Sequence, residues 1–125
     1  MAKVRDVMTP RNQLVVLNPT DSVSQALAKI KEIEIHGVMV SPGEGRAAWG
    51  IFTATDVVSF IASGRNADST MMMSVCNDVL WSASEDWDIQ ECAKRMNRQS
   101  IKHLPVIDSS GNLKGIITIE ELLKK

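Results

Sequence analysis

Apolar residues recur at helical spacing in two separate stretches of the chain. In each stretch, four apolar residues stand at positions i, i+3, i+4 and i+7, which places one apolar stripe along a helix. The two sets are Val23, Ala26, Leu27 and Ile30, and Ile89, Cys92, Ala93 and Met96. Short oxygen-bearing side chains that can cap a helix precede both sets, at 19–22 and 84–86. The pattern therefore predicts two amphipathic helices, one in each half of the chain.

Short apolar runs flank both predicted helices and indicate strands. One run precedes each helix and is rich in residues that favour strands. Two more runs follow each helix, separated by residues that favour turns, so each pair predicts a hairpin. The runs are 14–17, 38–40 and 50–52 in the first half, and 79–81, 104–107 and 115–117 in the second. Each half therefore reads strand, helix, strand, strand, helix.

The two halves are copies of one unit. Residues 50–58 (GIFTATDVV) align with residues 115–123 (GIITIEELL), and they share a glycine, an apolar pair, a threonine, an acid and two closing apolar residues. The lead-ins also match, because apolar residues stand at i, i+3 and i+4 in both: Val4, Val7 and Met8, and Met72, Val75 and Cys76. A polar linker at 62–70 separates the copies.

This duplication predicts an α/β (α+β) fold of two tandem βαββα repeats, at 1–64 and 65–125, which together form one globular module. A unit of this size buries little apolar surface alone, so we expect the two copies to pack their sheets about a pseudo-two-fold axis. Such packing creates two related clefts, and ligands commonly bind in clefts of this kind.

Composition narrows the functional classes. The chain has 125 residues, of which 44% are hydrophobic and 23% charged, and its formal net charge is -1. This balance is ordinary for a soluble protein and argues against a large basic surface for nucleic acid. No apolar run resembles a secretory signal or reaches the length of a membrane span, so we expect a cytoplasmic protein.

Three motifs, each present in order, carry a family resemblance. They are Val7-Met8-Thr9-Pro10 at the start, the segment 103–108 (HLPVID) before the second hairpin, and the segment 50–56 (GIFTATD). At these residues the chain resembles a tandem pair of cystathionine β-synthase (CBS) domains, often called a Bateman module. The resemblance covers nearly the whole chain. It implies a regulatory unit that binds adenosine-containing ligands without catalysis, requires no cofactor and pairs into a homodimer.

The first candidate site centres on Asp56. This acid follows a strand at a helix start, where its carboxylate can accept hydrogen bonds from the two vicinal hydroxyls of a ribose. Alternatively, Asp56 only stabilises the N-terminus of its helix, by about 0.3–1 kcal/mol. Thr53 and Thr55 flank the same helix start, where hydroxyls and free N–H groups suit a phosphate, although threonine also favours strands and caps. The resemblance implies the ligand-binding role.

The same resemblance brings in a segment of the second repeat. It implies that Ile101, Lys102, His103 and Pro105 approach the ligand held by the acid of the first repeat. Lys102 and His103 offer nitrogens to a phosphate, and the other two offer apolar faces to a purine. Without the resemblance, Lys102 reads as a solvated surface lysine and His103 as a partly buried histidine.

Val79 and Leu80 match positions that line the adenine side, and we expect both to be core residues as well.

The second cleft has a poorer set of residues. Glu121 replaces the aspartate, and its extra methylene displaces the carboxylate from a tight diol fit. His36 stands where the other copy has Lys102, and Met39 stands where it has Pro105, while Thr118 is retained. We therefore predict one competent site, centred on Asp56, and one weak, altered or empty site.

Other functional classes fit less well. Residues 71–73 (MMM) near Cys76 could bind a soft metal such as copper(I), but we expect them to lead into the second repeat with Met72 facing the core, so no metal site is predicted. The chain has no catalytic motif such as a nucleophile elbow, a P-loop or HExxH, so an enzyme is not expected.

Three hypotheses follow. The first is a sensor of AMP, ADP or ATP, with S-adenosylmethionine or NAD as further ligands, that regulates a separate protein. The second is an oligomerisation module with vestigial sites. The third is a nucleic-acid-binding module, which the near-zero net charge disfavours.

Overall fold

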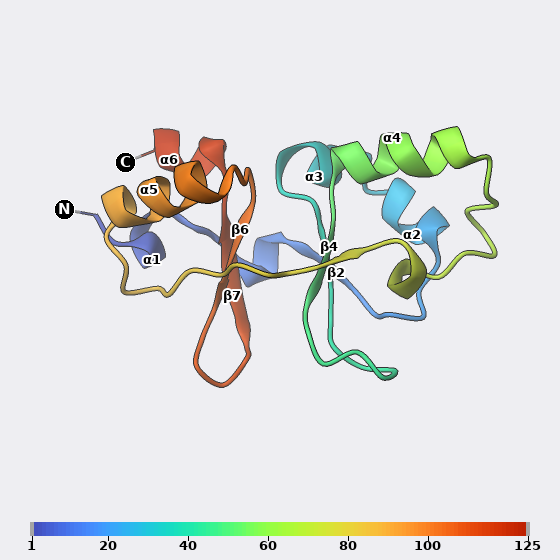
Figure 1. Ribbon diagram of the computed structural model, residues 1–125, viewed down its shortest axis with the longest axis horizontal. Coiled ribbons are helices and arrows are strands. Elements are labelled where there is room, and N and C mark those ends of the chain that lie inside the picture. The colour runs from blue at the N-terminus through green and yellow to red at the C-terminus, as the bar shows by residue number, and fades with distance from the viewer. Residues whose placement is uncertain (1, 125) are drawn as a thin grey trace. The chain divides into compact units, whose positions relative to one another are not determined.

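The computed structural model describes residues 2–124 and divides into two compact units. The central unit comprises Val15–Val79. The terminal unit comprises the segment that ends at Leu14 and the segment that begins at Leu80. Their elements are labelled in Figure 1. Both units mix helices with a small sheet, as the α/β (α+β) prediction requires.

The central unit contains a four-stranded sheet in the order β2-β3-β4-β5. Strands β2 and β3 are parallel, whereas β3 pairs with β4 and β4 pairs with β5 in antiparallel fashion. In chain order its elements are β2 (Val15–Leu17), α2 (Val23–Leu27), α3 (Ile30–Ile35), β3 (Val38–Val40), β4 (Gly50–Phe52), α4 (Ala54–Ser63), η2 (Met72–Ser74) and β5 (Asn77–Asp78).

The terminal unit contains a three-stranded sheet in the order β1-β7-β6, with both pairs antiparallel. In chain order its elements are α1 (Val4–Val7), β1 (Thr9–Pro10), η1 (Arg11–Gln13), α5 (Ile89–Gln99), β6 (Leu104–Ile107), β7 (Leu113–Ile117) and α6 (Ile119–Leu123). The hairpins β3–β4 and β6–β7 are both present, as predicted from the turn residues.

The lead-in of each sequence copy folds with the other copy. The Val4 N–H donates to the Trp87 carbonyl at 2.8 Å, so α1 lies beside the start of α5 (Figure 1). In the central unit, the Met72 N–H donates to the Asp21 carbonyl at 2.8 Å. The compact units therefore have different bounds from the sequence ranges 1–64 and 65–125, because these backbone hydrogen bonds exchange the two lead-ins.

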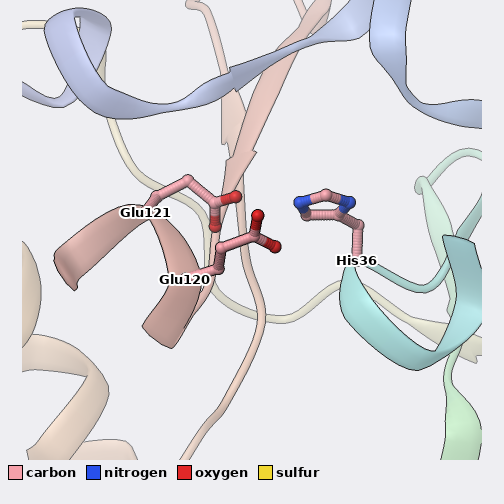
Figure 2. Close-up of side chains that lie close together, drawn as sticks. All are labelled: His36, Glu120 and Glu121. Carbon is pink, nitrogen blue, oxygen red and sulfur yellow. The ribbon is translucent and has the colours of Figure 1, made fainter. Parts of the chain in front are cut away.

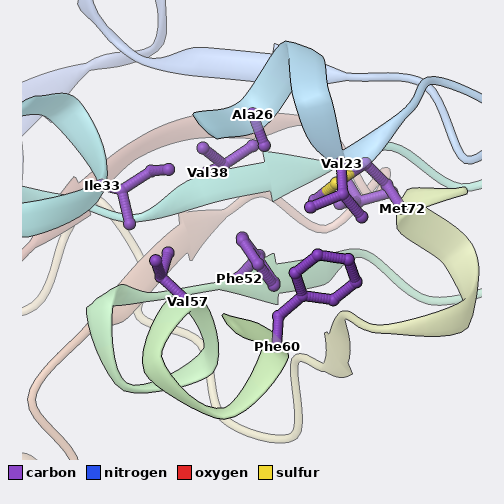
Figure 3. Packing of buried hydrophobic residues seen from close by; sticks show 9 residues of the cluster. Val23, Ala26, Ile33, Val38, Phe52, Val57, Phe60 and Met72 are labelled. Carbon is purple, nitrogen blue, oxygen red and sulfur yellow. The ribbon is translucent and has the colours of Figure 1, made fainter. Parts of the chain in front are cut away.

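Each unit has its own hydrophobic core. In the central unit, Phe52, Phe60, Val57 and Ile33 pack together with Met72, whose side chain is fully buried (Figure 3). This confirms that Met72 faces the core. The core of the terminal unit is built from Val4, Ala83, Ile89, Cys92, Met96, Leu104, Val106 and Ile117.

The second amphipathic helix is confirmed as α5, and the first is interrupted. The predicted stripe from Val23 to Ile30 is divided into α2 and α3, because Lys29 leaves the helical region with φ -111° and ψ 39°. Ile30 is consequently 47% exposed, and Ile33 takes the buried position.

The two helix starts also differ from each other. Ser22 caps α2, and its hydroxyl accepts the Gln25 N–H. The residues expected to begin the second helix, at 84–86, form a turn instead, and α5 begins at Ile89 after Asp88.

The prediction of a strand at 79–81 is wrong. The Val79 N–H still bonds to the Trp49 carbonyl at 2.8 Å, at the end of the central sheet. The next bridge is parallel, between Ala83 and Val106 in the terminal unit. The intervening residues connect the central unit to the terminal unit, and Leu80 is 78% exposed rather than in the core.

No helix within residues 2–124 combines the length and the apolar character needed to cross a membrane.

Candidate functional site

A threonine and an acid are bonded to each other at the start of α4. Thr53 is the N-cap residue, and its N–H donates to Asp56 Oδ2 at 2.8 Å. The Thr53 hydroxyl donates to the same oxygen at 3.2 Å. Asp56 therefore stabilises the N-terminus of α4, which is the alternative role considered in the sequence analysis.

The other oxygen of Asp56 is bonded as well. Asp56 Oδ1 accepts the Asn77 side-chain amide from β5 at 3.0 Å. A carboxylate offers roughly four acceptor positions, so these three donors leave space for about one more. Because Asp56 is only partly buried, a ligand hydroxyl can reach that position. A vicinal diol has two hydroxyls, so full bidentate binding would displace one of the present donors, either the Thr53 hydroxyl or the Asn77 amide.

The second copy repeats this arrangement with other side chains. Glu121 Oε1 accepts the Thr118 N–H and the Thr118 hydroxyl, both at 2.6 Å. Glu121 Oε2 accepts the Thr9 hydroxyl from β1 at 2.7 Å. Figure 2 shows Glu121 beside Glu120 on the first turn of α6. The Glu121 side chain is fully buried, so its carboxylate is less accessible than that of Asp56.

Thr9 and Asn77 occupy equivalent places in the two sheets. Thr9 lies opposite Ile116 in β7, and Asn77 lies opposite Ile51 in β4, the matching residues of the repeat. The longer acid, Glu121, thus accepts from the shorter donor, Thr9, and the shorter acid, Asp56, accepts from the longer donor, Asn77. Our sequence analysis missed both donors. The matching lead-ins carried the signal, because aligning Met8 with Cys76 also aligns Thr9 with Asn77.

The remaining first-site candidates divide between the units. In the central unit, Thr55 is exposed on the first turn of α4, and Val79 is partly buried. In the terminal unit, Lys102 is exposed, His103 is partly buried, Ile101 packs against the core, Pro105 is buried in β6, and Leu80 is exposed. Of the first-site candidates, the structure bonds Thr53 directly to Asp56.

The second-site candidates divide in the same way. In the central unit, His36 caps the C-terminus of α3, and Met39 is fully buried in β3. In the terminal unit, Thr118 and Glu121 form the bonded pair described above.

A second set of polar side chains lies around Gly50 at the beginning of β4. Arg46 Nη2 contacts Asp78 Oδ1 at 2.5 Å. Arg46 Nε is buried and has no hydrogen-bond partner among residues 2–124. A Cβ atom at Gly50 would lie 2.6 Å from Cys76 Sγ and 3.1 Å from Arg46 Nη2, so this close approach requires glycine. Burial raises the pKa of the Cys76 thiol, and the positive charge of Arg46 lowers it to a smaller extent.

Asp56 also borders a small polar hollow in the central unit. The hollow has a volume of about 200 Å³ and is lined further by Ser59, Ser63, Arg65 and Ser74. This volume is below the roughly 300–1,000 Å³ of sites for larger ligands, so the hollow can hold only a small group.

Comparison with known proteins found a matching family model and several relatives. A family model described as CBS domain matches residues 4–63 and 73–125. An uncharacterised 17.7 kDa protein of Acidianus ambivalens is 30% identical over 98% of this chain and 71% of its own length. An uncharacterised protein of Methanopyrus kandleri is 28% identical over 91% of this chain, which spans 58% of that relative.

Longer enzymes match over the same region. Inosine-5'-monophosphate dehydrogenase of Methanocaldococcus jannaschii is 27% identical, but the matched region makes up only 21% of the enzyme. This likeness concerns the repeats and carries no catalytic evidence.

Solved structures share the fold. A hexameric CBS-CP12 protein from bloom-forming cyanobacteria superimposes with a TM-score of 0.82 at 23% identity, over 100% of this chain and 71% of that one. CBSX2, solved in complex with AMP, superimposes with a TM-score of 0.79 at 22% identity, over 99% and 95% of the two chains.

Proposed function

Because this chain belongs to the CBS-domain family, we propose that it is a non-catalytic regulatory module that binds an adenosine-containing nucleotide, of the AMP, ADP or ATP class, between its two repeats. The observation that carries the proposal is the partly exposed carboxylate of Asp56, which Thr53 and Asn77 hold in one orientation. The AMP complex of the structural neighbour CBSX2 supports the choice of ligand class.

In this proposal Asp56 accepts the hydroxyls of the ribose. Hydrogen bonds to a charged acceptor are among the stronger ones, and the carboxylate is already oriented, so little side-chain entropy is lost on binding. The start of α4, with the Thr53 and Thr55 hydroxyls, favours an anionic phosphate. Lys102 and His103 supply further phosphate contacts, while the apolar surfaces of Val79, Leu80, Ile101 and Pro105 are assigned to the adenine.

The second position is assigned a weak or altered role. Its acid, Glu121, is fully buried and accepts three hydrogen bonds within the terminal unit. A ligand hydroxyl would have to open this arrangement and leave a buried donor unpaired, which costs about 1–3 kcal/mol. His36, Met39 and Thr118 complete that position, and we assign it no tight nucleotide binding.

A titration of the full chain with adenosine ligands tests the proposal. Calorimetry and thermal melting would be run with AMP, ADP, ATP, S-adenosylmethionine and NAD. A ligand that binds only the folded chain stabilises it by about 2.7 kcal/mol at a hundredfold excess over Kd. We expect Asp56→Ala to weaken binding of the preferred ligand at least about tenfold, because it loses hydrogen bonds to a charged group.

The matched control is Glu121→Gln, which alters the corresponding acid of the other repeat. It should leave affinity for the preferred nucleotide unchanged. A chain that responds to no adenosine ligand, or an Asp56→Ala variant that binds as tightly as the unaltered chain, would overturn the nucleotide assignment.

Regulation of a separate protein is the second half of the proposal. Linkage requires that a partner which changes the affinity for nucleotide have its own affinity changed by the same factor. Partner binding measured with and without the preferred nucleotide must therefore differ. In the Asp56→Ala variant that difference should disappear.

A second candidate function is oligomerisation, and a specific surface favours it. Val58 on α4 and Leu123 on α6 occupy matching positions of the repeat and are 69% and 79% exposed. Beside Leu123, an apolar groove of about 540 Å³ runs between α5 and α6 and is lined by Met96, Ile119 and Leu122, among others. Exposed apolar surfaces of this kind commonly mark protein contacts. The hexameric state of the CBS-CP12 neighbour is consistent with this use.

Sedimentation of the unaltered chain and of Leu123→Lys separates the two functions. A charge placed in a homodimer interface should dissociate the assembly while nucleotide affinity is retained. If the unaltered chain is a monomer at every concentration, the oligomerisation function is excluded.

A further inference from the structure

A small, partly open cavity lies within the terminal unit, between the segment that follows Leu80 and the C-terminal half of α5. Its volume is about 160 Å³, and the residues that line it include Trp81, Trp87, Arg95, Arg98 and Leu104. Two tryptophans and two arginines therefore line one cavity in a chain that contains three tryptophans.

The residues that line the cavity carry a net positive charge. Arg95 lies over the Trp87 ring, with its guanidinium carbon 4.4 Å from the ring centroid, and its Nε donates to Glu91 Oε2 at 2.8 Å. Glu91 thus compensates the charge of Arg95 and fixes its orientation. Arg98 lies one turn further along α5 and lines the same cavity. The residues that line the cavity thus include two arginines and no acidic residue, so the cavity favours an anion.

The other copy of the repeat shows that the fold does not require these residues. Parallel pairing in the two units matches Leu17 with Ala83, which places Val15 at the position of Trp81. In the central unit Val15 packs against the hydrophobic core. At this position one copy has an aliphatic side chain and the other has an indole.

The size of the cavity sets the size of its ligand. An apolar cavity of about 150 Å³ holds one benzene molecule, whereas sites for drug-sized ligands have about 300–1,000 Å³. The cavity is therefore too small for an adenosine nucleotide and large enough for one six-membered ring. Guanidinium groups bind carboxylates through paired hydrogen bonds, and indoles stack on aromatic rings.

We propose that this cavity binds a small monocyclic aromatic carboxylate, with its ring against the indole of Trp81 and its carboxylate paired with Arg98. None of its tryptophans or arginines is among the residues assigned to the nucleotide, although Ile101, which is assigned to the adenine, also lines the cavity. The site gives the module a second ligand chemistry, independent of the threonine and acid pair on α4.

Titration of the full chain with benzoate tests the proposal, with benzamide as the neutral probe of the same shape. Calorimetry gives the affinities, and the fluorescence of the tryptophans reports contact with an indole. We expect benzoate to saturate one site and to bind at least about tenfold more tightly than benzamide, because only benzoate forms a charge-assisted pair with arginine. Arg98→Gln should remove that difference, and Trp81→Leu should weaken both probes.

Two variants serve as controls. Arg65→Gln removes an exposed arginine of the central unit and should bind benzoate normally, as should Asp56→Ala, so failure of this proposal and failure of the nucleotide proposal are distinguishable. Arg98 is exposed on α5, so Arg98→Gln should melt at the same temperature as the unaltered chain. This variant therefore tests the proposal even if Trp81→Leu fails to fold. Equal affinities for benzoate and benzamide, no saturable binding, or unchanged benzoate affinity in Arg98→Gln would each overturn the proposal.

Discussion

Exchanging the acid and donor of one repeat for those of the other should show whether each pair is matched in length. The change replaces Glu121 by Asp and Thr9 by Asn in the terminal unit, which recreates there the pair formed by Asp56 and Asn77 in the central unit. In the unaltered chain, the Thr9 hydroxyl donates to the buried Glu121 carboxylate at 2.7 Å.

Each single substitution should destabilise the fold for its own reason. Glu121→Asp withdraws the carboxylate by one methylene and leaves a buried donor unpaired, at a cost of about 2 kcal/mol. Thr9→Asn forces a longer side chain against the existing glutamate, and overpacking of this kind costs about 1–3 kcal/mol. Independent effects would add to about 4 kcal/mol in the double variant.

The double variant should instead lose no more than about 1.5 kcal/mol, which means a coupling of at least about 2.5 kcal/mol between the two positions. Urea unfolding of the four chains measures all of these terms. The converse pair, Asp56→Glu with Asn77→Thr, repeats the test in the central unit. If the losses of the single variants add in the double variant to within about 0.5 kcal/mol, the idea of length-matched pairs is refuted.

Three further predictions concern stability. Gly50→Ala should lower the free energy of unfolding in urea by about 2 kcal/mol, because its Cβ would lie 2.6 Å from Cys76 Sγ. Adding Cys76→Ala should relieve much of that cost. An unchanged urea midpoint for Gly50→Ala would contradict the close approach. Burial raises the pKa of the Cys92 thiol from 9.0 to about 11, so its neutral form stabilises the fold below pH 9 and that stability is lost as the pH rises towards 11. The difference in unfolding free energy between the unaltered chain and Cys92→Ala should therefore shrink between pH 8 and pH 10.5, and a constant difference would count against this. Backbone hydrogen bonds from Asn112 and Ser110 lower the pKa of Asp108 below 3.8. The contribution of this carboxylate to stability is therefore present above pH 3.8 and is lost on further acidification. Asp108→Ala should lower the melting temperature at pH 7 more than at pH 3.

Local patterns predicted the elements that depend on their own side chains. The stripe from Ile89 to Met96 forms α5, and its apolar residues enter the core of the terminal unit. The turn residues between β6 and β7 close a hairpin in which Asp108 accepts the N–H groups of Ser110 and Asn112. These features follow from spacing and turn chemistry, which act within a few residues.

Elements that depend on distant partners were predicted less well. The apolar run at 79–81 has the composition of a strand, but its residues connect the central unit to the terminal unit and form no strand. The stripe from Val23 to Ile30 predicted one helix, yet the chain bends at Lys29 and buries Ile33 instead of Ile30. In both places, the position of neighbouring strands outweighs local preference, because buried surface and ladder hydrogen bonds are set by partners far away in the sequence.

For the candidate site, the sequence by itself determined the repeat, the threonine and acid at each helix start, and the inequality between Asp56 and Glu121. All three are visible because a duplicated chain can be compared with itself. Only the tertiary structure decided which donors complete each pair, since Thr9 meets an acid that lies 112 positions away. It also decided that one acid is buried and the other partly exposed, because the burial of a carboxylate depends on the side chains that fold around it rather than on its neighbours in the chain.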